Sequence, residues 1–255
     1  MVLPPVPDDS RTGRTLPVLQ QSLGFCAGLW GRLAVGAWQS RCMSKLLLQI
    51  GQPGSDPEGI ARKVLAKPAL VTEVIEGLQA DAARVKFGCA KVLRLVSERA
   101  PERLYPHFEF FVRLLDHENR ILQWEAVFVL SHLARVDVED KFEGIFGQYF
   151  APIPGPVMIT AANVIGGAAR IAVARPRWAD RIAREILKVA RARYQTAECR
   201  NVAIGHAIEA FGQFCDLLRD RAPVVRFVKG QLQNSRNATR KKAERFVRKR
   251  TVTAQ

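Results

Sequence analysis

The chain of 255 residues is poor in the residues that build most catalytic and metal sites. It has 4 histidines and 5 cysteines, and no cysteine stands in a Cys-x-x-Cys pair or next to a histidine at metal-ligand spacing. It also lacks a glycine-rich phosphate loop, a Gly-x-Ser-x-Gly nucleophile motif and a Ser-x-x-Lys motif. We therefore nominate no catalytic residue, metal ligand or cofactor, and expect a protein that is not an enzyme and has no small-molecule substrate.

Long alternating β-branched runs are missing, and so is an apolar stretch that could cross a membrane. The best candidate, 23–38, is apolar except for Arg32, but it is shorter than the roughly 20 residues of a membrane span. The hydrophobic content of 48% is nevertheless sufficient for a continuous core. Isolated cysteines of this kind are typical of free thiols in a reducing compartment, so we expect a cytoplasmic protein without a membrane span.

Acidic residues are few relative to basic ones, with 24 against 39 and a net charge of +15. The imbalance is concentrated near the C-terminus. Residues 219–250 hold twelve Lys or Arg and two acids, a balance of +10, and residues 170–200 hold nine against three, a balance of +6. Residues 98–143 reverse the sign, with six basic and ten acidic residues, a balance of −4. The sequence predicts an acidic middle and a basic C-terminal half.

The chain does contain one pattern repeatedly, with an apolar residue first, alanine sixth and an apolar residue ninth. It occurs at 85–93, 121–129, 157–165, 202–210 and 238–246, with the alanines Ala90, Ala126, Ala162, Ala207 and Ala243. Their separations of 36, 36, 45 and 36 residues are typical of stacked-repeat proteins. The three positions share one face of an α-helix, and a small residue lets two backbones approach, so we expect five helices that cross closely at these alanines.

Each of the first four segments is followed by a second apolar-striped stretch, so that the predicted unit is helix, turn, helix. These stretches cover 104–115, 142–150, 178–192 and 224–232. Pro101 and Pro223 stand where the first turn of a second helix tolerates proline. Asp81, Asp116 and Asn234 precede first helices, and we expect them to cap those helices.

The repeated segments resemble the HEAT repeat, whose first line reads Leu-Leu-x-Asp, a short gap and Val-Arg-x-x-Ala-Ala-x-Ala-Leu. Residues 85–93 match closely, with Lys86 in the arginine position, and Leu114-Leu115-Asp116 followed by 121–129 matches nearly as well. The resemblance covers roughly residues 56–250. It implies an all-α, right-handed α-solenoid of about five HEAT-like helix-turn-helix repeats. HEAT repeats share no catalytic residues, so it also implies a scaffold that binds macromolecules.

The predicted domain organisation follows from the extent of the repeats. Residues 43–81 form N-terminal capping helices, 82–250 form the repeats and 251–255 are a tail. Residues 1–42 show no repeat and include Trp30 and Trp38. Because Met43 opens Met-Ser-Lys-Leu-Leu-Leu, an extension upstream of a misplaced start is one interpretation of this segment. A disordered extension and a targeting segment are the alternatives.

The basic side chains of the C-terminal half are the predicted contact surface. They step along one second helix at intervals of three and four residues and continue into the last repeat. The predicted residues are Arg181, Arg184, Lys188, Arg191, Arg226, Lys229, Arg236, Arg240, Lys241, Lys242 and Arg245. Part of this charge would serve only to keep the outer face of the terminal repeat hydrated.

Two kinds of partner suit such a surface. We predict a scaffold or adaptor that binds an acidic macromolecule, with a protein as the first choice of partner. A protein that binds the nucleic-acid backbone is the alternative, because Lys and Arg bind phosphates without sequence specificity. Only Phe227 and Phe246 are aromatic in 219–250, and both fit the core stripe, which argues against base stacking on single strands.

A third hypothesis is a DNA glycosylase of the HEAT-like class, which would need aromatic residues and a carboxylate on one face. Trp124 with Glu125, and Trp178 with Asp180, are the only pairs of the right type. Both tryptophans also fit packing positions, and no motif of that family is present beyond the repeat. Fold alone does not carry function, so this hypothesis is the weakest of the three.

Several other polar or small residues are best interpreted as packing residues. We expect His132 and His206, on first helices near the apolar stripe, to be hydrogen-bonded within the fold rather than to bind a metal. Cys89 occupies a small-residue position of the repeat and should be buried. Gly166 and Gly167 lie inside a predicted helix, where they would permit a close helix approach.

Overall fold

The computed structural model describes residues 43–252 of the chain. The predicted N-terminal extension, 1–42, and the last three residues lie outside the described part, and so do Cys26 and Cys42.

Residues 43–252 are helical throughout and contain no strand. The α-helices are α1 (Lys45–Gly51), α2 (Pro57–Ala66), α3 (Leu70–Glu76), α4 (Ala83–Arg99), α5 (Phe108–Leu114), α6 (Arg120–Leu133), α7 (Lys141–Phe150), α8 (Met158–Ala174), α9 (Ala179–Leu187), α10 (Ala197–Phe214), α11 (Ala222–Gly230) and α12 (Asn237–Val252). Short 3₁₀ helices cover Gly77–Gln79, Pro101–Arg103, Tyr105–His107, Pro176–Trp178, Lys188–Arg191, Cys215–Leu217 and Gln231–Gln233. No helix in this part of the chain is both long and apolar enough to cross a membrane.

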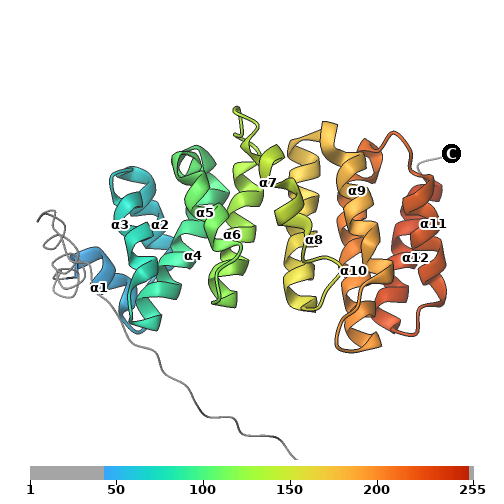
Figure 1. Cartoon of the computed structure of the whole chain (residues 1–255), viewed down its shortest axis with the longest axis horizontal. Coiled ribbons are helices and arrows are strands. Elements are labelled where there is room, and N and C mark those ends of the chain that lie inside the picture. The colour runs from blue at the N-terminus through green and yellow to red at the C-terminus, as the bar shows by residue number, and fades with distance from the viewer. Residues whose placement is uncertain (1–42, 253–255) are drawn as a thin grey trace, which may run out of the picture. The chain divides into compact units, whose positions relative to one another are not determined.

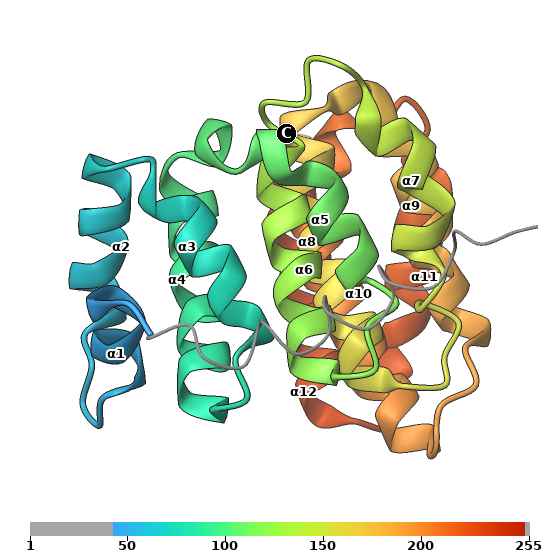
Figure 2. The same ribbon diagram turned by 60° about the vertical axis from the view of Figure 1, so that its left-hand side comes forward.

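The helices of residues 43–252 stack as an α-solenoid (Figure 1). The first helices of the repeats, α4, α6, α8, α10 and α12, form one row in which each packs against the next. The second helices α5, α7, α9 and α11 lie beside that row, as Figure 2 shows from another side. Helices α1, α2 and α3 pack on α4 at the N-terminal end. The α-solenoid predicted from the repeat period is confirmed.

Four of the five repeat alanines are buried in the row of first helices. Ala90, Ala126, Ala207 and Ala243 are each 3% exposed or less. A small side chain at a buried helix crossing lets the two backbones approach closely, which explains why the repeat places alanine at these positions.

The third repeat departs from the prediction at its alanine. Val157 precedes α8 as its N-cap residue, and the helix begins at Met158. Ala162 is only half-buried and the adjacent Ala161 is fully buried, whereas Ile165, the ninth residue of the pattern, is buried as predicted. Ile121 also differs from prediction: it is 41% exposed, and Leu122 points inward instead.

Two of the three predicted capping residues, Asp81 and Asp116, do not cap a helix. Asn119 caps α6, because its Oδ1 accepts from the backbone N–H of Ile121 at 3.0 Å and of Leu122 at 3.3 Å. Asp116 instead accepts from the side chain of Gln148 at 2.7 Å. A capping side chain must directly precede the helix to reach its free N–H groups. Asp81 fails this requirement, since α4 follows Ala82 and has no side-chain cap.

Two of the four second helices, α5 and α9, are shorter than predicted, whereas α7 matches the predicted stretch 142–150. Pro101 does open a helical turn, but α5 starts only at Phe108, after two 3₁₀ turns that contain Pro101 and Pro106. Proline removes a backbone donor, which interrupts the α-helical ladder. The stretch predicted as 178–192 is α9 followed by the 3₁₀ helix Lys188–Arg191. Pro223 lies in the first turn of α11, as predicted.

Gly167 provides the close approach predicted for the glycine pair. A side chain there would collide with the hydroxyl of Tyr149, which donates to the carbonyl oxygen of Val127 at 3.1 Å. Gly166, in contrast, has open space where a side chain would stand. Only one of the two glycines is therefore required by packing.

Buried polar groups in the core have structural partners. His132 is 6% exposed, and its Nδ1 lies 2.9 Å from Ser97 Oγ, which confirms a hydrogen-bonded packing role. Burial, together with the positive charges of Arg170 and nearby arginines, lowers the pKa of His132 to about 4. Cys89 is buried as predicted, and burial raises the pKa of its thiol to about 12.

Candidate binding surface at the C-terminal end

The predicted contact residues fall on two rows of helices rather than on one face. Six belong to the row of second helices, with Arg181 and Arg184 on α9, Lys188 and Arg191 in the 3₁₀ turn after it, and Arg226 and Lys229 on α11. Arg236 precedes α12, and Arg240, Lys241, Lys242 and Arg245 lie on α12. Helices α11 and α12 pack against each other at the end of the solenoid, so the two groups meet there.

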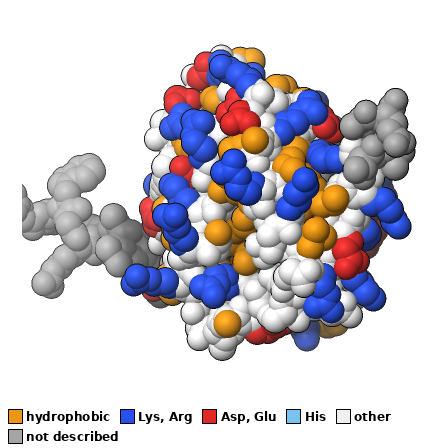
Figure 3. Space-filling view, turned by 90° about the vertical axis from the view of Figure 1, so that its right-hand side faces the viewer, with side chains coloured by type: hydrophobic (Ala, Val, Ile, Leu, Met, Phe, Trp, Pro, Cys, Tyr) orange, Lys and Arg blue, Asp and Glu red, His pale blue; other side chains and the backbone are white. Residues whose placement is uncertain are grey.

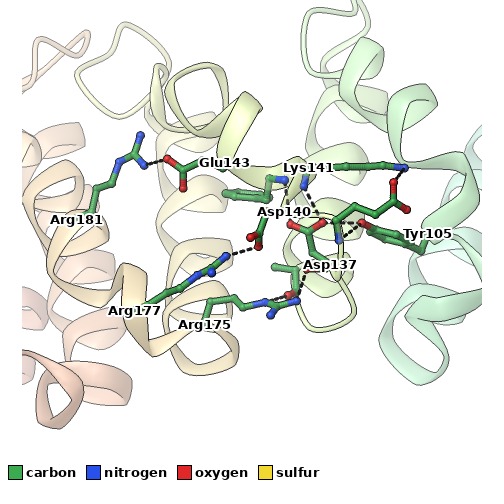
Figure 4. Close-up of polar contacts among 11 residues, drawn as sticks. Tyr105, Asp137, Asp140, Lys141, Glu143, Arg175, Arg177 and Arg181 are labelled. Atoms are coloured by element: carbon green, nitrogen blue, oxygen red, sulfur yellow. Dashed lines mark hydrogen bonds and ion pairs between the residues drawn. The ribbon is translucent and has the colours of Figure 1, made fainter.

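On α9 and in the 3₁₀ turn after it, two of the predicted cations are engaged within the protein. The guanidinium of Arg181 forms an ion pair with Glu143 of α7 (Figure 4). It also lies over the ring of Phe146, 3.7 Å from the ring centroid. Lys188 Nζ lies 2.5 Å from Glu185 Oε2. Arg181 thus joins two repeats and presents less free charge than the sequence suggested.

Near α12, two more cations bind carboxylates of the preceding repeat. Arg236 Nε lies 2.7 Å from Glu198 Oε1, and Lys242 Nζ lies 3.0 Å from Glu209 Oε2. Arg240 donates to the backbone oxygen of Asn234 at 2.9 Å, which holds the turn before α12. These contacts fasten the last repeat to the one before it.

The pairs belong to a ladder of ion pairs between consecutive repeats. Arg177 pairs with Asp140, and Arg219 Nε lies 3.4 Å from Asp180 Oδ2. In each pair the arginine follows the acid by nearly one repeat length, 37 residues for Arg177 and 39 for Arg219. The spacing of acids and bases in the sequence contains this regularity, although it was not predicted.

The turn between α6 and α7 is held by a further polar cluster (Figure 4). Asp137 is fully buried, and its carboxylate accepts from Tyr105 Oη at 2.7 Å and from the backbone N–H groups of Lys141 at 2.9 Å and Phe142 at 3.0 Å. Arg175 Nε donates to the backbone oxygen of Ala134 at 2.8 Å. Asp137 belongs to the acidic middle of the sequence and Arg175 to its basic half. Both therefore have structural roles.

Seven predicted contact residues make no ion pair with any residue between 43 and 252, and six of these seven are exposed. The exposed six are Arg184, Arg191, Arg226, Lys229, Lys241 and Arg245. The seventh, Arg240, is half-buried and holds the turn before α12. Arg193 and Arg200 share both properties but were not among the predicted residues, although both lie in the basic stretch 170–200. We call the six exposed predicted residues the unpaired cations.

The end of the solenoid carries much of this charge. Figure 3 looks onto the C-terminal end and shows Lys and Arg side chains spread over it, with apolar side chains between them. The aromatic residues of this end face inward. Phe246 is 6% exposed, and the half-buried Phe227 packs against Phe211 with ring centroids 6.0 Å apart. The end thus offers positive charge without stacking platforms.

The two tryptophan–carboxylate pairs have other roles. Trp178 is 5% exposed and packs against Phe142, with ring centroids 5.6 Å apart. Trp124 Nε1 donates to Thr160 Oγ1 at 2.9 Å and so joins α6 to α8. Glu125 lies 3.2 Å from Arg94, and burial raises the pKa of its carboxyl. These contacts assign packing and helix-joining functions to the residues that a glycosylase hypothesis would need.

Comparisons with known proteins agree with this architecture. No family model and no curated protein matches the chain. A designed armadillo repeat protein is similar in structure with a TM-score of 0.54, at 13% identity over 79% of this chain and 89% of that one. Another designed armadillo repeat protein, in complex with the peptide (KR)4, gives a TM-score of 0.50 at 13% identity over 82% of this chain and 99% of that one. The chain is an α-solenoid of helical repeats, similar in fold to these armadillo repeat proteins.

Proposed function

We propose that this protein is a binding scaffold without catalytic activity, and that the unpaired cations at its C-terminal end hold an acidic segment of another protein. The observation that carries the proposal is the separation of the basic residues into two groups. Three of the four paired cations join repeats, whereas the unpaired ones have no ion-pair partner within 43–252. Unpaired like charges repel one another, so their accumulation calls for an external anion.

The proposed partner is a protein because the basic residues here already bind carboxylates. Arg236 with Glu198 and Lys242 with Glu209 show that carboxylates fit between these helices. A helical-repeat surface can also hold a charged peptide, as the designed protein in complex with (KR)4 illustrates. That peptide is basic, so the opposite charge at this C-terminal end favours an acidic segment.

The repeat type and the compartment belong to the same proposal. Armadillo repeats have three helices and HEAT repeats two, and each unit here has two α-helices with short 3₁₀ turns, which favours the HEAT type. Cys89 and Cys215 are buried free thiols, and burial raises the pKa of each. Such thiols suit the reducing cytoplasm.

The proposal can be tested with two variants of equal charge. One replaces three unpaired cations, Arg226, Lys241 and Arg245, by Gln. The matched control replaces three paired ones, Arg181, Lys188 and Arg236, by Gln. Binding of a fluorescent poly-glutamate peptide at low salt is then measured by anisotropy. We expect the first variant to lose about ten-fold in affinity and the control about three-fold or less, because its targets are already neutralised.

The same titration with random duplex DNA distinguishes protein binding from the alternative, nucleic-acid binding. If duplex DNA binds more tightly than poly-glutamate, and its affinity falls with salt at about −0.9 per phosphate contact, the nucleic-acid hypothesis replaces this one. Equal losses in both variants would mean that only the overall charge matters, which would contradict a specific role for the unpaired cations.

A further inference from the structure

A groove separates α10 and α12 at the basic end of the solenoid. Its volume is about 250 Å³, and its walls include Ile208, Glu209 and Gly212 of α10 and Arg245 and Phe246 of α12. This is less than the roughly 300 Å³ of the smallest typical ligand pockets, so the groove suits one or two side chains rather than a whole ligand.

Two glycines on α10 explain why the groove is open. At Gly205 the helices touch, and an added Cβ would lie 3.1 Å from Thr239 Oγ1 of α12. At Gly212, two turns further along α10, an added Cβ would meet nothing within 4 Å. The two helices therefore diverge toward the C-terminal end of α10, and the missing side chain of Gly212 widens the gap.

The floor of the groove is apolar. Ile208 is 2% exposed and Phe246 is 6% exposed, and both line the groove. An apolar side chain that entered beside Gly212 would contact both residues, and its apolar surface would be removed from water on binding.

The rim of the groove is positive. Glu209 is the single acid in its lining, and Lys242 pairs with it at 3.0 Å. Arg245 has no ion pair within residues 43–252. A carboxylate that arrived with a partner would therefore meet an excess of positive charge here.

Arg250 adds a second donor to this rim. Its guanidinium lies 4.2 Å from the centroid of the Phe246 ring, and its Nε is buried without a hydrogen-bond acceptor in the described part of the chain. Its Nη2 is 3.5 Å from Asp216, a carboxylate that is largely exposed and also pairs with Arg221. Arg250 lines the groove, so its positive charge adds to that of Arg245 there.

We propose that this groove binds a large apolar side chain, such as Leu or Phe, carried by the acidic segment of the partner, whose carboxylates pair with Arg245 and Arg250. The inference rests on the proposed function and specifies the partner: an acidic segment that includes a bulky apolar residue. A nucleic-acid backbone has phosphates but no such side chain, and would leave the groove empty.

The test uses two peptides of identical charge, a poly-glutamate chain with one central Leu and the same chain with Ala in place of Leu. Wild-type protein should bind the Leu peptide about ten-fold more tightly, as expected when most of a leucine side chain is buried. Gly212→Leu fills the groove from within. In this variant both peptides should bind with the affinity that the wild type has for the Ala peptide.

Gly144→Leu is the matched control. Gly144 lies on α7, outside the groove lining, and a side chain there would also meet nothing within 4 Å. We expect this variant to keep the full preference for the Leu peptide. Both substitutions replace a helical glycine with a stronger helix former, so circular dichroism should show a folded protein in each case.

The outcomes of this test distinguish a wrong groove assignment from a wrong proposed function. Equal affinity of the wild type for the two peptides, or a Leu preference that survives Gly212→Leu, would overturn the groove assignment while the proposed function stood. If neither peptide binds and duplex DNA does, the proposed function fails and the groove assignment fails with it.

Discussion

Single small residues decide how closely the helices of this solenoid approach one another. At Gly167 of α8 the absent side chain leaves room for the hydroxyl of Tyr149, which bonds to the backbone of α6. At the adjacent Gly166 the same absence has no packing consequence. Substitution of Gly166 and of Gly167 should therefore change the stability of the fold by different amounts, although the two are identical neighbours in the sequence.

Gly167→Ala should lower the free energy of unfolding by about 1–3 kcal/mol, because Tyr149 must move and its buried hydrogen bond to Val127 is lost. Gly166→Ala should be neutral or stabilising by up to about 1 kcal/mol, since alanine favours the helix. Urea denaturation followed by circular dichroism measures both. Equal effects of the two substitutions would contradict the packing at Gly167.

His132 makes the stability of the fold sensitive to acid. Its pKa falls from the ordinary histidine value of 6.5 to about 4 in the folded protein, mainly because the ring is buried. Between these values the unfolded chain binds a proton that the folded chain does not, so acid stabilises the unfolded state relative to the folded one. Stability from this source is complete above pH 6.5 and is lost progressively down to pH 4.

His132→Gln should remove that loss, which amounts to about 3 kcal/mol between pH 6.5 and pH 4. Glutamine can still form a hydrogen bond with Ser97 Oγ but does not titrate. Denaturation at a series of pH values would show the wild-type curve falling more steeply than that of the variant over this interval. Parallel curves would show that acid acts on the fold through other groups.

At the scale of the element, two adjacent alanines of one helix differ in burial. In α8, which starts at Met158, Ala161 is fully buried and Ala162, the alanine of the repeat pattern, is only half-buried. The same substitution should therefore have different effects at these two positions.

Ala161→Asp should therefore cost several kcal/mol, because an unpaired carboxylate would be buried between helices. Ala162→Asp should cost roughly half of that or less, because its side chain can reach water. Thermal melting of the two variants gives the comparison. A larger loss for Ala162→Asp would contradict this difference in burial.

On the scale of the whole molecule, stability is distributed along a row of similar interfaces. Each first helix contacts only its neighbours in the row, so the terminal helix α12 has a single neighbour there, α10, while α6 lies between α4 and α8. Repeat proteins of this kind behave approximately as a one-dimensional sum of units and interfaces. The same substitution should then have different consequences at the end and in the middle.

Ala126→Asp in α6 should lower the stability of the whole solenoid by several kcal/mol, whereas Ala243→Asp in α12 should detach the last repeat locally. Both alanines are almost fully buried, at 1% and 0% exposure, so burial does not distinguish them. Hydrogen exchange should show lost protection over all repeats in the first variant and over α11 and α12 in the second. Global loss in both would contradict the linear arrangement.

Much of the fold could be predicted from the sequence because it depends on short-range periodicity. The alanines at 90, 126, 207 and 243 mark their helices by spacing alone, and prolines mark several of the turns. The site was less predictable. Arg181 and Arg184 look equivalent along α9, yet the first pairs with Glu143 and the second has no ion-pair partner within 43–252. That difference depends on an acid one repeat away, whose distance is decided by packing.

By itself, the sequence determined that the chain stacks helix pairs and that its C-terminal half is strongly positive, since the repeat period and the charge are properties of composition and spacing. The tertiary structure alone decided which cations remain for a partner, and where α10 and α12 part to leave a groove beside Gly212. The physical reason is the separation along the chain of the residues involved. Helix formation depends on residues close in sequence and net charge on composition, whereas ion pairs and grooves depend on side chains that only the stacking of repeats brings together.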